Sequence, residues 1–151
     1  MFHIILHQPE IPQNTGSIGR LCVSNGARLH LVHPLGFDAG EAAVRRAGLD
    51  YWERLNPTHY ADWDDLLARN PARRLWFFST KGRRIHTEVP FAAGDGLVFG
   101  RETVGLPPEI LEGNADRLVR IPMLGDFHRS LNLAQAAAVA LYEALRQTQG
   151  W

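Results

Sequence analysis

Short apolar runs, separated by polar or glycine-containing turns, recur along the whole chain. The runs are too short for helices and are typical of buried strands. They lie at residues 2–6, 28–33, 74–78, 96–99 and 118–121, with a weaker strand pattern at 49–55.

Segments with apolar residues at helical spacing lie between these runs. Asn14 and Thr15 are typical N-cap residues for the first of them, and Gly26 is placed to end it. Further helices are predicted at residues 61–69, 107–111 and 131–147, with a weaker pattern at 41–47.

Strands that alternate with helices predict an α/β fold with a mostly parallel sheet flanked by helices. Parallel neighbours need this order because their connection takes a dozen or more residues. Ligands of such sheets bind at the carboxyl ends of the strands. The candidate loops are therefore residues 8–14, 79–82, 100–107 and 122–130.

A length of 151 residues allows one domain, which we expect to span residues 1–151. Hydrophobic residues make up 45% of the chain and charged residues 21%, which predicts an ordinary globular core and excludes disorder as the main state. Cys22 is the single cysteine, and no cationic leader or membrane-length apolar run is present. We therefore expect a soluble, cytoplasmic protein.

Charge and histidine content limit the possible ligands. The 16 basic and 16 acidic side chains cancel, so nucleic acid would have to bind to a local patch. Two histidine pairs invite a metal interpretation, but strand periodicity places His30 and His33 on opposite faces. The other pair is His3 and His7, and no zinc-ligand spacing is present. We expect no metal.

Two segments combine a strand end with glycine and polar residues. Residues 97–107, LVFGRETVGLP, allow the backbone to approach a ligand closely, although a plain strand-to-helix turn has the same pattern. Residues 120–133, RIPMLGDFHRSLNL, form an irregular loop before a helix that Ser130 or Asn132 could cap. The GxGxxG and GxxxxGK[ST] signatures are absent, which argues against dinucleotide or NTP binding.

Three ordered segments resemble the motifs of the SPOUT superfamily of methyltransferases. They are NTG at 14–16 with Arg20, FGRETVGLP at 99–107, and IPM at 121–123 with SLNL at 130–133. The similarity is strongest to the TrmL group of tRNA 2′-O-methyltransferases. It covers nearly the whole chain, including EIP at 10–12 and RRAGLDY at 45–51.

The resemblance implies a deep C-terminal trefoil knot, which is rare among protein topologies. In this family the knotted loops bind S-adenosylmethionine in a bent shape, largely through backbone groups. Glu102 would hold the loop or pair with a cation near the cofactor. By motif position, the cofactor-binding residues are Phe78, Gly100, Glu102, Ile121, Met123, Ser130 and Leu133.

The implied reaction is transfer of the methyl group to a ribose 2′-hydroxyl. Arg20 matches the family's proposed proton acceptor, but a guanidinium has no acceptor lone pair, so a phosphate clamp is a second role. Asn14 would orient the ribose or brace the site, or only cap a helix. Ser130 and Asn132 would hydrogen-bond the catalytic loop or the cofactor.

Basic residues near predicted strand ends are the candidates for RNA binding. Three cations in the segment 81–84 follow a strand tip beside a proposed cofactor loop, although a solvated loop has the same composition. Tyr142 matches a position that the TrmL group uses near RNA, although helical spacing also suits packing. The candidates are Arg45, Arg46, Arg73, Arg74, Lys81, Arg83, Arg84 and Tyr142.

One copy of this chain offers little surface to a tRNA, and the family solution is a homodimer whose partner completes the site. Residues 131–145 and the first helix are the candidate interface. The expected substrate is the wobble nucleotide of the tRNA anticodon stem-loop, a cytidine or modified uridine of leucine isoacceptors. Alternatives are 2′-O-methylation of ribosomal RNA or another tRNA position, and a non-catalytic knotted RNA-binding module.

Overall fold

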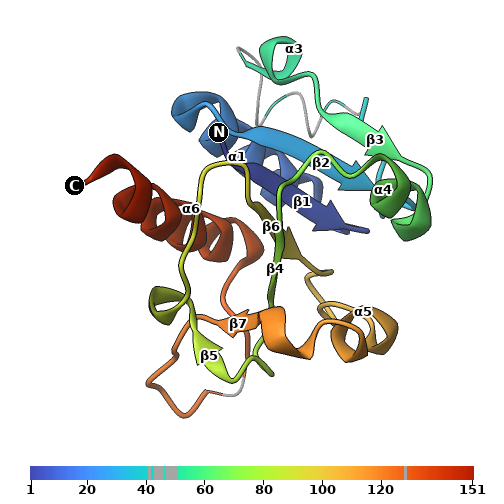
Figure 1. Ribbon diagram of the computed structural model, residues 1–151. Helices are drawn as coiled ribbons and strands as arrows, with labels where there is room; N and C mark the ends of the chain where they lie inside the picture. Colours follow the sequence, from blue (N-terminus) through green and yellow to red (C-terminus); the bar gives the residue numbers. More distant parts are fainter. Residues whose placement is uncertain (41, 43–45, 47–50, 128) are drawn as a thin grey trace.

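A computed structural model describes residues 1–40, 42, 46, 51–127 and 129–151. The strands are β1 (His3–His7), β2 (Arg28–Val32), β3 (Thr58–Tyr60), β4 (Leu75–Phe78), β5 (Arg84–Ile85), β6 (Gly96–Phe99) and β7 (Leu118–Arg120). They form one sheet in the order β3-β2-β1-β6-β4-β7-β5, and every pairing is parallel (Figure 1). The predicted parallel α/β fold is confirmed.

Helices cover both faces of the sheet (Figure 1). On one face, α1 (Pro12–Asn25) packs against α6 (Leu133–Gln149), and on the other lie α4 (Trp63–Arg69) and α5 (Pro108–Glu112). Shorter segments are α3 (Trp52–Leu55), η1 (His86–Glu88) and η2 (Ala115–Arg117). No helix in the described part of the chain is long and apolar enough to cross a membrane.

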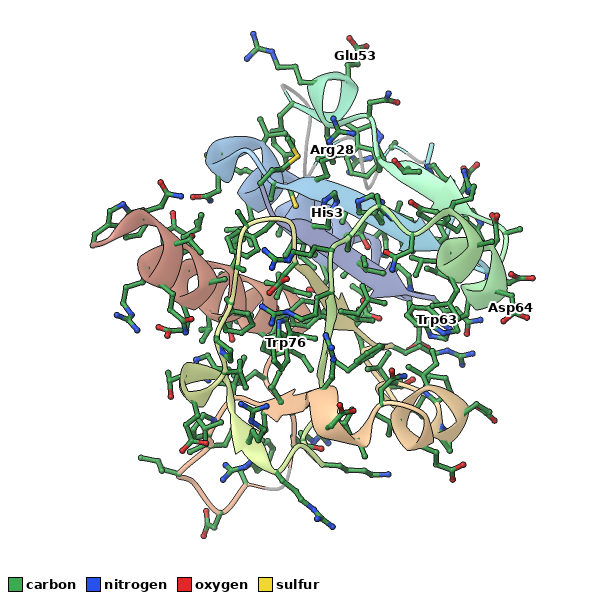
Figure 2. The ribbon with its side chains drawn as sticks, viewed as in Figure 1. His3, Arg28, Glu53, Trp63, Asp64 and Trp76 are labelled. Atoms are coloured by element: carbon green, nitrogen blue, oxygen red, sulfur yellow. The ribbon has the colours of Figure 1, made fainter. Side chains whose placement is uncertain are left out.

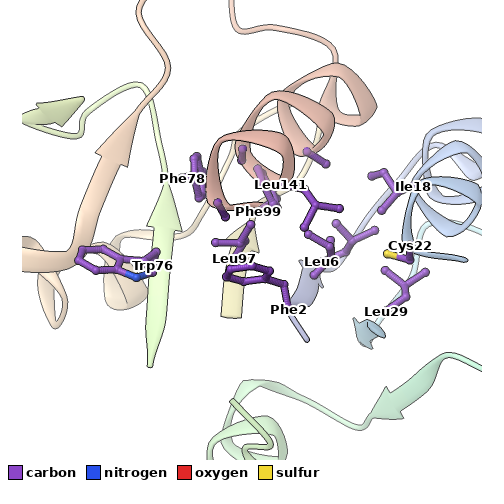
Figure 3. Close-up of a cluster of buried hydrophobic side chains, with 14 of the residues drawn as sticks. Phe2, Leu6, Ile18, Cys22, Leu29, Trp76, Phe78, Leu97, Phe99 and Leu141 are labelled. Carbon is purple, nitrogen blue, oxygen red and sulfur yellow. The ribbon is translucent and has the colours of Figure 1, made fainter. Parts of the chain in front are cut away.

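Alternate side chains of the central strands enter two separate hydrophobic clusters. Leu6 of β1 belongs to the larger cluster under α1 and α6, whereas its neighbour Ile5 faces α4 and α5. Figure 3 shows the larger cluster, in which Leu141 of α6 lies over the strands. Phe78 of β4 and Phe99 of β6 stack there with ring centroids 4.8 Å apart, so the end of the sheet near the candidate loops is firmly packed.

The helix ends test the capping predictions. Gly26 ends α1 in the left-handed conformation, with φ of 64°, as predicted. The predicted N-caps Asn14 and Thr15 are wrong, because Pro12 begins the helix two residues earlier and both side chains are buried in the first turn. Asn132, one of the two alternatives, caps α6.

The weaker patterns gave less accurate predictions. The strand predicted at 49–55 is wrong in its described part, since residues 52–55 form α3. Trp52 and Leu55 are three residues apart, and this helical spacing brings both side chains against Gly19 of α1. The predicted helix at 41–47 falls mostly outside the described residues. The short strands β3 and β5 were not predicted.

Candidate functional site

The loops at the carboxyl edge of the sheet surround a cavity of about 1020 Å³. Its lining comes from the start of α1 and from the segments that follow β4, β6 and β7. All four loops that the sequence singled out therefore contribute to one site. Parallel strands bring these loops together because their carboxyl ends meet at the same edge.

Residues from all three similar segments line this cavity. The predicted site residues that line the cavity are Asn14, Phe78, Lys81, Gly100, Glu102, Ile121, Met123, Ser130, Asn132 and Leu133. Arg20, Arg46, Arg83, Arg84 and Tyr142 do not line it. Arg45 lies outside the described residues. The structure thus brings the predicted cofactor residues together, and their individual roles stay predictions.

Gly100 stands where the loop after β6 folds back on itself. Arg101 and Gly105 pair across this loop, with the Gly105 amide donating to the Arg101 carbonyl at 2.9 Å and the Arg101 amide to the Gly105 carbonyl at 3.2 Å. A Cβ atom on Gly100 would overlap the backbone of Gly105 and Leu106. Only glycine fits, because the loop's own backbone occupies the space that a side chain at this position would need.

Glu102 joins this loop to the start of α1. Its carboxylate accepts hydrogen bonds from the amides of Glu10 at 2.7 Å and Ile11 at 3.0 Å, and from Asn14 Nδ2 at 3.4 Å. Since α1 has no side-chain cap of its own, Glu102 supplies the negative charge that its N-terminus favours. This contact supports the first predicted role for Glu102, holding the loop.

Asn132 extends the network to the third segment. Its Nδ2 donates to Asn14 Oδ1 at 3.0 Å, while its Oδ1 accepts from the amides of Ala134 at 2.9 Å and Gln135 at 3.2 Å. Glu102, Asn14 and Asn132 therefore form one continuous chain of hydrogen bonds. Asn14 lies in the middle of this chain, bonded to both loops, and its role toward the ribose stays a prediction.

The wall of the cavity is apolar and its rim carries cations. Phe78 and Leu133 are buried beside it, whereas Met123 and Phe127 expose apolar surface at its edge. Arg129 lies with its guanidinium 5.6 Å from the Phe127 ring centroid. Backbone groups, apolar walls and a cationic rim suit an elongated ligand with a planar ring and a carboxylate.

Two contacts beside the cavity were not found from the sequence. Arg101 donates to Gln8 Oε1, and Gln8 adopts a φ of 52°, which is unfavourable for a residue other than glycine. Glu10 accepts from Thr103 Oγ1 at 2.7 Å and from the Thr103 amide at 3.1 Å. These bonds hold the pKa of the Glu10 carboxyl below its ordinary value. The partners are more than ninety residues apart, so no local pattern reveals them.

His7 lies at the end of β1, beside a second cavity of about 620 Å³ that shares Arg101 with the first. Its Nδ1 is buried without a partner in the described structure. Burial and the nearby Arg101 lower the pKa of His7 to about 4, so the ring is neutral near pH 7. The described residues contain no group of three His, Cys, Asp or Glu side chains arranged to hold a metal ion.

Arg20 lies on the exposed side of α1. It forms no hydrogen bond or ion pair with any other residue that the structure describes. The side chain is therefore free to contact a molecule outside its own chain. Tyr142 of α6 is likewise 48% exposed, and its ring lies 6.3 Å from that of Trp151.

Solved structures similar to this chain include methyltransferases. One, described as giving structural insights into the 2-OH methylation of C/U34 on tRNA, is 42% identical, with a TM-score of 0.92 and coverage of 97% of this chain and 95% of its own. An AdoMet-bound rRNA methyltransferase from Sinorhizobium meliloti has a TM-score of 0.83 at 28% identity, covering 96% of this chain and 56% of its own. Fold and cavity thus place the chain in the methyltransferase class.

The chain belongs to the SpoU rRNA Methylase family, whose model matches residues 1–142. A relative from Saccharophagus degradans is 52% identical over 97% of this chain and 96% of its own. One from Escherichia coli is 46% identical over 97% of this chain and 94% of its own. Both are named tRNA (cytidine(34)-2'-O)-methyltransferase. The resemblance seen in the three sequence segments is confirmed.

Proposed function

We propose that this protein transfers a methyl group from S-adenosylmethionine to the ribose 2′-hydroxyl of the wobble nucleotide of tRNA. Relatives named tRNA (cytidine(34)-2'-O)-methyltransferase are about half identical to this chain over almost its full length. The observation that carries the proposal is the meeting of all three similar segments in one cavity. Ribosomal RNA is the less favoured substrate, because the rRNA enzyme compared is only 28% identical.

The cavity suits S-adenosylmethionine, which supplies the methyl group when bound. Gly100, Ile121 and Met123 would hold the adenine through backbone groups, between the apolar side chains of Phe78 and Leu133. Ser130 would hydrogen-bond the amino-acid end or the catalytic loop. Glu102 stays in the proposal as a residue that shapes the cofactor loop, since its oxygens already accept three hydrogen bonds.

Arg20 has the main catalytic role in the proposal. A guanidinium has donors only, so Arg20 clamps the phosphate beside the target ribose in a bidentate manner, and water or another group takes the hydroxyl proton. Because Arg20 does not line the cavity of its own chain, the partner subunit of a homodimer presents it. α1 and α6, which pack side by side, form the proposed dimer interface.

The remaining expectations complete the proposal. The RNA substrate is the anticodon stem-loop, including leucine isoacceptors with cytidine or modified uridine at the wobble position, and it contacts Arg46, Lys81, Arg83, Arg84 and Tyr142. A deep trefoil knot is formed by the C-terminal loops. Residues 1–151 act as a single domain in the cytoplasm.

Methyl transfer to defined RNA tests the proposal. Purified protein, S-adenosylmethionine and a tRNA transcript lacking modifications are incubated, and the modified nucleotide is mapped by its resistance to alkaline cleavage. We expect one 2′-O-methyl group at the wobble position. Methylation only elsewhere in tRNA or only in ribosomal RNA would contradict the substrate, and no methyl transfer despite S-adenosylhomocysteine binding would contradict the activity.

A further inference from the structure

Three arginine side chains surround the indole ring of Trp76 on β4. The guanidinium carbons of Arg74, Arg84 and Arg117 lie 5.0, 5.8 and 5.7 Å from the ring centroid. Trp76 is only 4% exposed, so the ring serves as a platform beneath the cations and is not itself a surface for stacking bases. We call these four residues the Trp76 cluster.

One cation of the Trp76 cluster is neutralised within the protein. Arg74 Nη2 forms an ion pair with the fully buried Asp95 at 2.7 Å and also donates to the Pro90 carbonyl. The same carboxylate accepts a hydrogen bond from Trp76 Nε1 at 2.9 Å. Arg74 and Asp95 therefore belong to the structural core of the cluster.

The other two cations have no such partner. Arg84 and Arg117 form no ion pair and donate no side-chain hydrogen bond to another residue in the described parts of the chain. Two carboxylates lie nearby in sequence, but Glu88 accepts from the Ile85 amide and Asp116 is exposed. Like charges gathered around one ring repel each other, and anions bound to Arg84 and Arg117 would relieve that repulsion.

Contact with the Trp76 ring also preorganises the guanidiniums of Arg84 and Arg117 for anion binding. The ring restricts the side chain while leaving the N–H donors available, so bidentate binding of a phosphate orders fewer groups. Arg84 lies on β5 at the edge of the sheet, and Arg117 directly precedes β7. Trp76 lies two residues before Phe78, which ends β4 and begins the cavity segment 78–81.

We propose that Arg84 and Arg117 on the Trp76 platform form a phosphate-binding site for the RNA backbone that flanks the methylated nucleotide. This inference rests on the proposed function, and it extends the predicted basic segment 81–84 to Arg117, which no sequence motif indicated. The chemistry recognised is two phosphodiester groups, independent of base identity.

Binding of an unmodified tRNA transcript to the full-length protein tests the site. The variant R84A–R117A is compared with wild type by fluorescence anisotropy between about 50 and 300 mM KCl. Affinity at low salt should fall roughly tenfold to a hundredfold. The slope of log affinity against log salt should decrease by about 1.5 to 2, because two phosphate contacts are lost.

A matched control removes the same charge elsewhere. R28A–R54A changes two exposed arginines on β2 and α3, far from Trp76, as the labelled Arg28 and Trp76 in Figure 2 show. This variant should bind tRNA with a nearly unchanged salt slope. Equal losses in both variants, or no loss in R84A–R117A, would overturn the site. The methylation assay is scored separately: wild type that binds tRNA but transfers no methyl group contradicts the proposed function alone.

Discussion

The cofactor loops and the Trp76 cluster differ in whether their polar groups already form hydrogen bonds or ion pairs within the protein. At the loops, the Glu102 carboxylate is occupied by Glu10, Ile11 and Asn14, and Asn132 closes the chain. At the Trp76 cluster, two of the three guanidiniums contact the ring but have no ion-pair or hydrogen-bond partner among the described residues.

This difference distinguishes residues that fix the shape of a site from residues that bind a ligand. A polar group whose hydrogen bonds are already made within the protein fixes the shape of a site. A charged group held in place by a ring or a helix, with its donors still unused, can bind a ligand. By this criterion Arg20 resembles Arg84 and Arg117, and Glu102 resembles Asp95.

The largest effect is expected in the cofactor loops. Gly100→Ala would force a Cβ into the backbone of Gly105 and Leu106, so the loop must open. We expect the affinity for S-adenosylhomocysteine, measured by calorimetry, to fall at least roughly a hundredfold. Gly113→Ala is the control, because a Cβ there would make only an ordinary contact and the residue does not line the cavity. Similar affinities for the two variants would contradict the tight loop.

The second-largest effect is expected from Asp95, whose ion pair with Arg74 has a structural role in the Trp76 cluster, unlike the binding role of Arg84 and Arg117. Asp95→Asn leaves Arg74 without its buried counter-charge, and urea unfolding should show a loss of about 2 to 4 kcal/mol. Asp116→Asn, an exposed carboxylate, should change stability by less than about 0.5 kcal/mol. If Asp95→Asn is as stable as wild type, the carboxylate does not support the platform.

Buried histidines on the other face of the sheet give a pH-dependent effect. His30 bonds His3 Nδ1 through its Nε2 and Tyr60 through its Nδ1, and burial lowers the pKa of His30 to about 4. Below pH 6.5, the ordinary pKa of a histidine, His30 therefore binds more protons in the unfolded chain than in the folded chain. The contribution of neutral His30 to the free energy of unfolding is therefore fully present above pH 6.5 and declines as the pH falls toward 4.

Removing His30 should flatten this decline. Between pH 7 and 5, His30→Gln should reduce the loss of unfolding free energy by roughly 1 to 2 kcal/mol relative to wild type. Urea titrations at several pH values measure the difference. An identical pH dependence in both proteins would show that His30 is not held neutral by the fold.

The smallest expected effect concerns the unpaired cations. Arg84 is exposed and Arg117 is half-buried, and neither forms an ion pair with a described residue. Arg84→Ala and Arg117→Ala should therefore each change the midpoint of thermal unfolding little, by the equivalent of about 0.5 kcal/mol or less. A large loss of stability in either variant would assign that arginine to the structural part of the cluster, beside Arg74.

The sequence predicted most of the fold because its main signals are local. Apolar runs predicted five of the strands, and Asn132 was one of two expected caps for α6. The strand predicted at 49–55 is wrong in its described part because Trp52 favours strands by propensity, whereas in the folded chain Trp52 and Leu55 pack together against Gly19 from one helical face. β5 is two residues long, which is too short for any periodic pattern.

The site was predicted from motifs, whereas its internal bonds were not. The motifs named the residues that line the cavity, but spacing cannot show that Glu102 accepts from Glu10 across 92 positions. The pairing of Arg117 with Trp76 likewise depends on the order of β4, β7 and β5 in the sheet. Contacts of this kind follow from the folded chain alone.

Mixed dimers test most directly whether the cofactor loops of one subunit act with Arg20 of the other. Arg20→Ala and Gly100→Ala chains, each inactive alone, are co-expressed with different tags, and the mixed dimer is purified and assayed for tRNA methylation. One complete site per dimer should restore about half of the wild-type activity. A mixed dimer as inactive as its parents, or the absence of any mixed dimer, would contradict the account.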